Sequence, residues 1–110
     1  MIRLLVLFSL FVISSCTYHE LSPCDTDEPT YSDCVKPIIA ANCLDCHSNG
    51  SAFGELLTYE ELKWFFDRDL IERIQMNEND LGFMPFQGEK LNESDIQILI
   101  KWKNNGAPNN

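Results

Sequence analysis

Two cysteines and a histidine lie within five consecutive residues of the chain, Cys43-Leu44-Asp45-Cys46-His47. Two thiols separated by two residues can each add to one vinyl group on the same edge of a porphyrin, and the imidazole after the second thiol is then held beneath the iron. The second nitrogen of that imidazole is expected to donate to a backbone carbonyl. The pattern predicts one covalently bound haem c, attached through Cys43 and Cys46, with His47 as the proximal iron ligand.

Other interpretations of this motif explain fewer of its residues. A structural zinc site needs a fourth ligand, and the adjacent Cys46 and His47 lack the usual spacing of zinc ligands. A thioredoxin-like redox pair belongs at the start of a helix in a βαβ unit, and no such pattern is visible. A plain disulfide between Cys43 and Cys46 would leave His47 without a role.

The chain begins with a segment typical of exported proteins. Residues 1–15 have a short basic start and an apolar run, residues 4–13, which is too short to span a bilayer and suits a signal peptide. Residues 16–30 are polar, contain two prolines and follow no hydrophobic period, so we expect a tether. Residues 31–110 are expected to form the single folded domain.

The apolar run ends in Ile13-Ser14-Ser15-Cys16, which resembles a bacterial lipobox. In that class of proteins the chain is cut before the cysteine, which then carries acyl chains. The resemblance implies that Cys16 anchors an exported protein to a bacterial membrane, on its periplasmic or cell-surface side. Ordinary secretory cleavage near Ser15 is the alternative.

The remaining cysteines form an even number. With Cys16 assigned to lipid, and Cys43 and Cys46 to haem, Cys24 and Cys34 are left of the five. An even remainder in an exported chain predicts a disulfide, although two free thiols remain the alternative.

The chain is strongly acidic, with a net charge of −9. Loss of residues 1–15 removes Arg3 and leaves seven basic side chains against 17 acidic ones. A nucleic-acid partner is not expected, because such binding depends on basic patches. The charge suits a redox protein partner with a basic docking face, or it serves solubility alone.

Apolar residues at helical spacing predict an all-α domain. The first helix is expected over residues 32–42, with Pro37 tolerated only near its first turn. A capping box, Thr58 with Glu61, predicts the start of a second helix. Asp69 with Glu72 predicts the start of a third helix, with a less regular cap than the capping box of the second. The apolar residues of the second and third helices either wall a porphyrin or form ordinary core; they are Leu62, Phe65, Phe66, Leu70, Ile71 and Ile74.

The last helix has the clearest boundaries. Asn92 is expected as its N-cap and Asp95 as its N3 acid, and Gly106 with Pro108 ends it. Its apolar face is expected to follow Ile96, Leu99, Ile100 and Lys103, with Ile98 and Trp102 beside that face.

A loop is expected over residues 77–90, and it contains Met84 directly before a proline. A thioether held among apolar neighbours suits the sixth coordination position of haem iron, so Met84 is predicted as the distal ligand. Met76 is the competitor, but it falls at the end of a helical pattern. The alternative role for Met84 is to fill a gap under the loop. The second histidine, His19, is interpreted as an incidental tether residue.

With His47 and Met84 in these roles, residues 31–108 resemble a small monohaem c-type cytochrome of class I. The resemblance rests on the Cys-Leu-Asp-Cys-His block, supported by Met84-Pro85 and the terminal Trp102. It implies three to five short helices around one haem, with the first and last helices crossing beside it and one haem edge exposed. Cys34 within the first helix and the lipid anchor are not features of the soluble members.

The expected function is electron transfer by a membrane-anchored cytochrome that cycles between ferric and ferrous iron. No acid–base dyad, nucleophile triad or phosphate loop is recognised, so the chain is not expected to be an enzyme. Two alternatives stay open. One is a haem-based sensor or enzyme accessory domain with a labile sixth ligand; the other is a haem-free binding lipoprotein.

Overall fold

The structure, a computed structural model, describes residues 24–110, and within this range every regular element is a helix. The elements are η1 (Tyr31–Val35), α1 (Lys36–Asn42), α2 (Tyr59–Phe66), α3 (Leu70–Gln75) and α4 (Glu93–Asn104). The all-α prediction is therefore confirmed for the described part of the chain. None of these helices is long and apolar enough to cross a membrane. The expected signal peptide, Cys16 and His19 lie outside the described residues.

The first helix consists of η1 and α1 in direct succession, and it matches the expected range of 32–42 closely. Thr30 caps it, because its side-chain oxygen accepts from the amide of Asp33 at 3.1 Å. The amide of Val35 bonds the Thr30 carbonyl, five residues back, which makes the first turn a wide π turn. Pro37 is the second residue of α1 but the seventh of the combined helix, so it lies beyond the first turn where the sequence analysis expected it, directly after the wide π turn of η1.

The predicted capping box of α2 is confirmed: the side chain of Thr58 accepts from the amide of Glu61, and that of Glu61 accepts from the amide of Thr58. The predicted cap of α3 is wrong. Asp69 precedes this helix but makes no capping hydrogen bond. Its carboxylate instead accepts from Nε of Arg73 at 2.8 Å. The hydrogen-bond donor to Asp69 is therefore a side chain one turn along the helix and not a backbone amide of the first turn.

Helix α4 begins and ends where the sequence predicts. Asn92 accepts from the amide of Asp95 at 2.8 Å, and Gly106 follows the helix with a φ of 94°. Its buried residues are Ile96, Leu99 and Trp102. Trp102 is thus central to the buried face and not beside it, as the sequence analysis expected. Its indole nitrogen, the only polar atom of its side chain, donates to the carbonyl of Pro108 at 3.0 Å.

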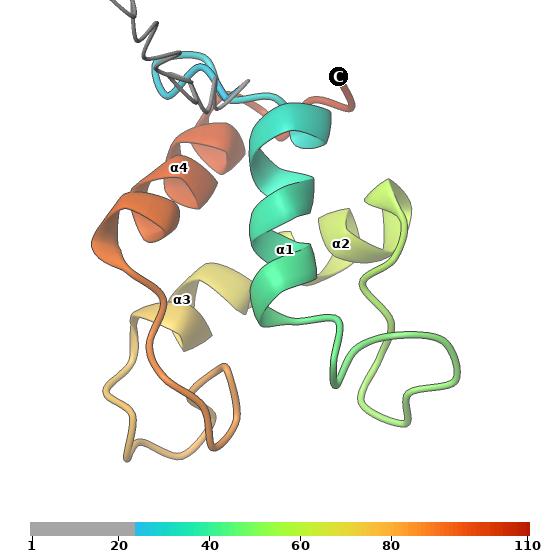
Figure 1. The fold of residues 1–110 in the computed structure, drawn as a ribbon, viewed down its shortest axis with the longest axis vertical. Helices are drawn as coiled ribbons and strands as arrows, with labels where there is room; N and C mark the ends of the chain where they lie inside the picture. The colour runs from blue at the N-terminus through green and yellow to red at the C-terminus, as the bar shows by residue number, and fades with distance from the viewer. Residues whose placement is uncertain (1–23) are drawn as a thin grey trace, which may run out of the picture.

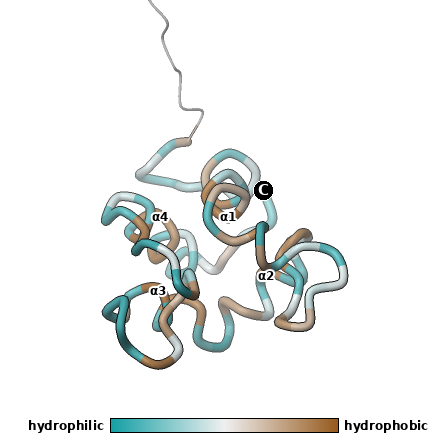
Figure 2. Tube along the Cα trace, turned by 60° about the horizontal axis from the view of Figure 1, so that its bottom comes forward, coloured by the Kyte–Doolittle hydropathy of each residue, from teal (hydrophilic) through white to brown (hydrophobic). Residues whose placement is uncertain are grey.

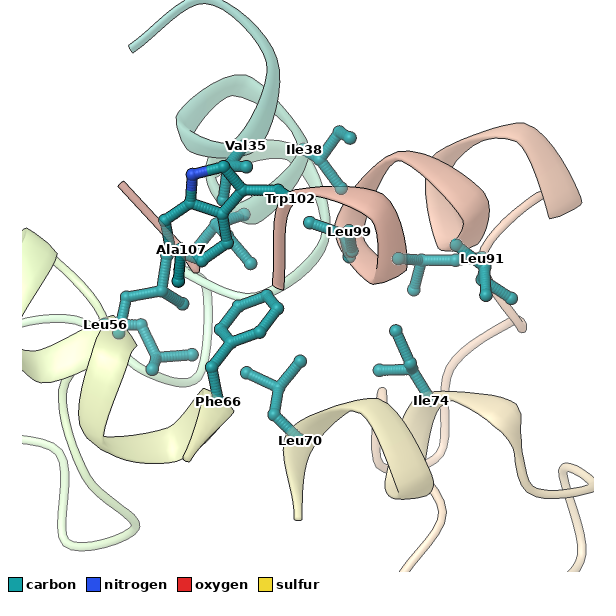
Figure 3. Packing of buried hydrophobic residues seen from close by; sticks show 13 residues of the cluster. Val35, Ile38, Leu56, Phe66, Leu70, Ile74, Leu91, Leu99, Trp102 and Ala107 are labelled. Atoms are coloured by element: carbon teal, nitrogen blue, oxygen red, sulfur yellow. The ribbon is translucent and has the colours of Figure 1, made fainter. Parts of the chain in front are cut away.

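The core gathers around Trp102, which is fully buried against Phe66 with ring centroids 5.0 Å apart (Figure 3). Val35 and Ile38 from the first helix and Leu99 from α4 complete this side of the core (Figure 3). Helix α4 contacts the first helix mainly at η1, close to the start of that helix. In Figure 2 hydrophobic and hydrophilic residues alternate along the helices, as expected of helices that each bury one face.

Residues 24–30, the second half of the expected tether, are fastened to the domain. A disulfide joins Cys24 to Cys34, and Pro29 is buried. The ammonium group of Lys101 on α4 donates to the carbonyl of Thr26 at 3.2 Å. Any free spacer must therefore lie before Cys24.

Two long connections lie at the same end of the molecule, away from residues 24–30 and the C-terminus (Figure 1). One runs from the end of α1 to α2 and contains the Cys-Leu-Asp-Cys-His motif. The other runs from α3 to α4 and contains Met84. The fold therefore brings the two predicted ligand-bearing segments to the same end of the helical core.

Candidate haem site

The cysteine motif continues directly from helix α1. The amide of Cys43 donates to the carbonyl of Ile39 at 2.9 Å, as a further α-helical residue would. The carbonyl of Cys43 then accepts from the amides of Cys46, at 3.2 Å, and of His47, at 2.9 Å. Cys43 and Cys46 are three residues apart in the sequence, and this single turn brings them to the same side of the chain. Neither cysteine is in a disulfide, and both line one cavity.

The orientation of His47 is set by a carbonyl seven residues along the chain. Its Nδ1 lies 2.9 Å from the carbonyl oxygen of Gly54. Because a carbonyl only accepts, Nδ1 carries the hydrogen, and the lone pair of Nε2 is left free to bind a metal. The carbonyl of His47 also accepts from the amide of Leu56 at 2.9 Å. These contacts give the imidazole the kind of backbone partner that the sequence analysis expected, and identify it as Gly54.

Gly54 is a site residue that the sequence reasoning missed. Its φ is 100°, and a Cβ added there would lie 2.4 Å from Cζ of Phe65. The Phe65 ring packs edge-on against His47, with centroids 6.2 Å apart. A glycine is therefore required for the backbone to reach the imidazole beneath this aromatic ring. The only signal in the sequence was the presence of two glycines, Gly50 and Gly54, in the connection after the motif.

We expect Gly54→Ala to lower the free energy of unfolding by about 1–3 kcal/mol more than Gly50→Ala, since only the first forces a methyl group into a packed ring. Gly50 is a matched control because its φ is 75° and an added Cβ would meet nothing within 4 Å. Denaturant unfolding of both variants measures the difference. Equal losses would show that Phe65 can move away at no cost.

A cavity of about 650 Å³ lies between the two connections and the helices. This volume falls within the range of small-molecule and cofactor sites, roughly 300–1,000 Å³. Cys43, Cys46 and His47 line it from one connection and Met84 from the other. Aliphatic residues from the core form much of the remaining wall; they include Leu70, Ile74, Leu91 and Leu99 (Figure 3).

Met84 and Met76 differ in their relation to this cavity. Met84 is half-buried and lines it, and its amide donates to the carbonyl of Arg73 at 3.2 Å. Met76 does not line it; its sulfur lies close to Gly82, 3.8 Å from where a Cβ would be. The geometry therefore favours Met84 over Met76 as the methionine that can reach a group bound in the cavity.

The adjacent aromatic residues of α2 have different environments. Phe66 is fully buried in the core, whereas Phe65 is half-buried and lines the cavity. Leu70 and Ile74 of α3 also line it, so part of the predicted apolar set walls the cavity. Leu62 is buried in the core and does not line it.

The cavity also carries charged and polar groups that sequence reasoning did not single out. Arg68 and Arg73 both line it, and the Arg68 guanidinium stacks over Trp64 at 4.3 Å from the ring centroid. Burial, together with the neighbouring Cys46 thiol, raises the pKa of the Cys43 thiol to about 11. Cys43 is therefore a neutral thiol at pH 7 in the absence of a bound group.

In residues 24–110 no three or more His, Cys, Asp or Glu side chains are grouped so that they could hold a metal ion. The described part of the chain thus lacks the cluster that a structural zinc site would need. A scan against protein-family models, a search of curated proteins and a search of solved structures each found no match.

Proposed function

We propose that the protein is a lipid-anchored monohaem c-type cytochrome that transfers electrons. One observation carries the proposal: Cys43, Cys46, His47 and Met84 line a single cavity, although Met84 is 37 residues from His47 in the sequence. The two thiols would hold the haem covalently, and His47 and Met84 would be its axial ligands. The fold proposed for the domain is accordingly cytochrome c-like.

The chemistry of the donor set fits this group. The hydrogen bond from Nδ1 of His47 to Gly54 orients the imidazole and increases its basicity as a ligand through Nε2. The Met84 thioether favours the ferrous state relative to a harder oxygen or nitrogen ligand. When bound, the haem would supply the one-electron chemistry, and the aliphatic wall of the cavity would keep water from the iron.

The visible spectrum of the purified full-length protein, made in a host that matures c-type cytochromes, tests the proposal. We expect haem that stays on the chain after denaturation, because thioether bonds are covalent. In the ferric protein we expect the far-red band of iron–thioether bonding. A colourless protein would favour a haem-free binding lipoprotein. A haem protein without the far-red band would favour a sensor or accessory domain with an open sixth position.

The anchor and the partner belong to the same proposal. Cys16 would carry the lipid, and mass spectrometry of the purified protein detects its acyl chains or their absence. Two or more acyl chains are needed for durable attachment to a membrane.

The acidic protein would be steered to a redox partner with a basic face, so the rate of electron transfer to that partner should fall as salt is added. A rate that does not change with salt would show that the negative charge does not steer the partner and serves solubility alone.

A further inference from the structure

Arg73 of α3 contacts the Met84 loop, residues 77–90, through both its backbone and its side chain. Its carbonyl accepts from the amide of Met84 at 3.2 Å, and its Nη1 donates to the carbonyl of Gly82 at 3.3 Å. Its Nε meanwhile donates to the Asp69 carboxylate at 2.8 Å. A single residue thus binds the loop at Met84 and two residues before it.

The surroundings of Arg73 fit a fixed role for its side chain. Asp69 makes no capping bond at the start of α3, so its carboxylate is free to hold the guanidinium of Arg73 one helical turn away. Gly82 has a φ of 95°, and a Cβ added there would lie 3.4 Å from Nη1 of Arg73. An added Cβ would thus only touch the Arg73 side chain, and the positive φ is what favours a glycine at this point of the loop.

Near its ends the loop is hydrogen-bonded both within itself and to α3. The amide of Asn77 donates to the Asp80 carboxylate at 3.1 Å, and the ammonium group of Lys90 donates to the carbonyl of Gln75 at 3.1 Å. Arg73 acts between them, next to Met84. A group that binds a metal from an irregular loop needs its position set by such supporting hydrogen bonds.

We propose that Arg73 is a positioning residue for the Met84 thioether and that Asp69 holds Arg73 in place for this role. The inference rests on the proposed function, because it concerns the sixth ligand of a haem. Without the Arg73 side chain, the loop at Gly82 loses its link to α3 and Met84 leaves the sixth position more often. An external ligand then competes for that position more easily.

The test uses the haem-loaded full-length protein and compares Arg73→Gln with wild type. We expect a weaker far-red band in the ferric protein and imidazole binding roughly tenfold faster, in line with the effect of removing a supporting partner. Asp69→Asn should change both in the same direction by a smaller factor. The Arg73 and Asp69 side chains are 39% and 43% exposed, so neither substitution is expected to prevent folding.

A matched control separates positioning from general stability. Lys63→Gln removes an ion pair of the same four-residue spacing, with Asp67, from a position that does not line the cavity. It should keep the far-red band and the wild-type rate of imidazole binding. The inference is overturned if Arg73→Gln also keeps them, even if its reduction potential changes, since Arg73 would then act as a charge. A wild-type protein without haem or without the band would contradict the proposed function, and this inference with it.

Discussion

Replacing both Cys43 and Cys46 by alanine is expected to leave a chain that no longer unfolds cooperatively. The cavity that these residues line measures about 650 Å³ in a domain with only five short helical elements. A cavity that stays enclosed in a protein core lowers the free energy of unfolding by roughly 24 cal/mol per Å³ of its volume. Even a fraction of that cost is large beside a net stability of about 5–15 kcal/mol. A group bound only in the folded state offsets it directly.

Thermal unfolding followed by circular dichroism measures this effect in the two-cysteine variant. Cys46→Ala alone is the graded control, because Cys43 can still form one thioether bond and retain the haem. We expect its transition to lie between those of the wild type and the double variant. A cooperative transition in the double variant, at the temperature of the wild type, would show that the helical core is stable without a bound group.

The sequence predicted the helices well because their signals are local. Thr58 with Glu61, and Asn92 with Asp95, lie three residues apart, and each pair forms the predicted hydrogen bond to a backbone amide. Asp69 is the exception. Its carboxylate had two partners within reach, the amides of its own helix and Arg73, and the guanidinium also bonds the Gly82 carbonyl in the loop. The contact of Arg73 with Gly82 lies outside the helix, so the local pattern around Asp69 does not contain it.

The candidate site was predicted less completely than the helices for the same reason. Phe65 and Phe66 are neighbours that the helical period puts on one side, but Phe66 packs on Trp102 and Phe65 packs on His47. Only the tertiary arrangement separates them. The sequence analysis likewise expected a carbonyl partner for His47 but could not identify Gly54, because that choice depends on how the connection folds back toward Phe65.

Replacing Met84 by alanine is expected to abolish the far-red band of the ferric protein while leaving the haem bound through Cys43 and Cys46. Met84 lines the same cavity as His47 but comes from the other connection, and it would be the thioether that completes the coordination of the iron. Its loss should lower the reduction potential, because a thioether stabilises ferrous iron relative to the harder ligand that replaces it. Imidazole and cyanide should bind faster than in the wild type.

Met76→Ala is the matched control, because it removes the same side chain from a position that does not line the cavity. It should keep the band, the potential and the rates of ligand binding. A loss in the Met76 variant with none in the Met84 variant would reverse the assignment of the sixth ligand. If neither variant changes the spectrum, the iron has five ligands or another residue binds it. The comparison therefore decides between an electron carrier, in which the sixth position is closed, and a sensor or accessory domain, in which it opens.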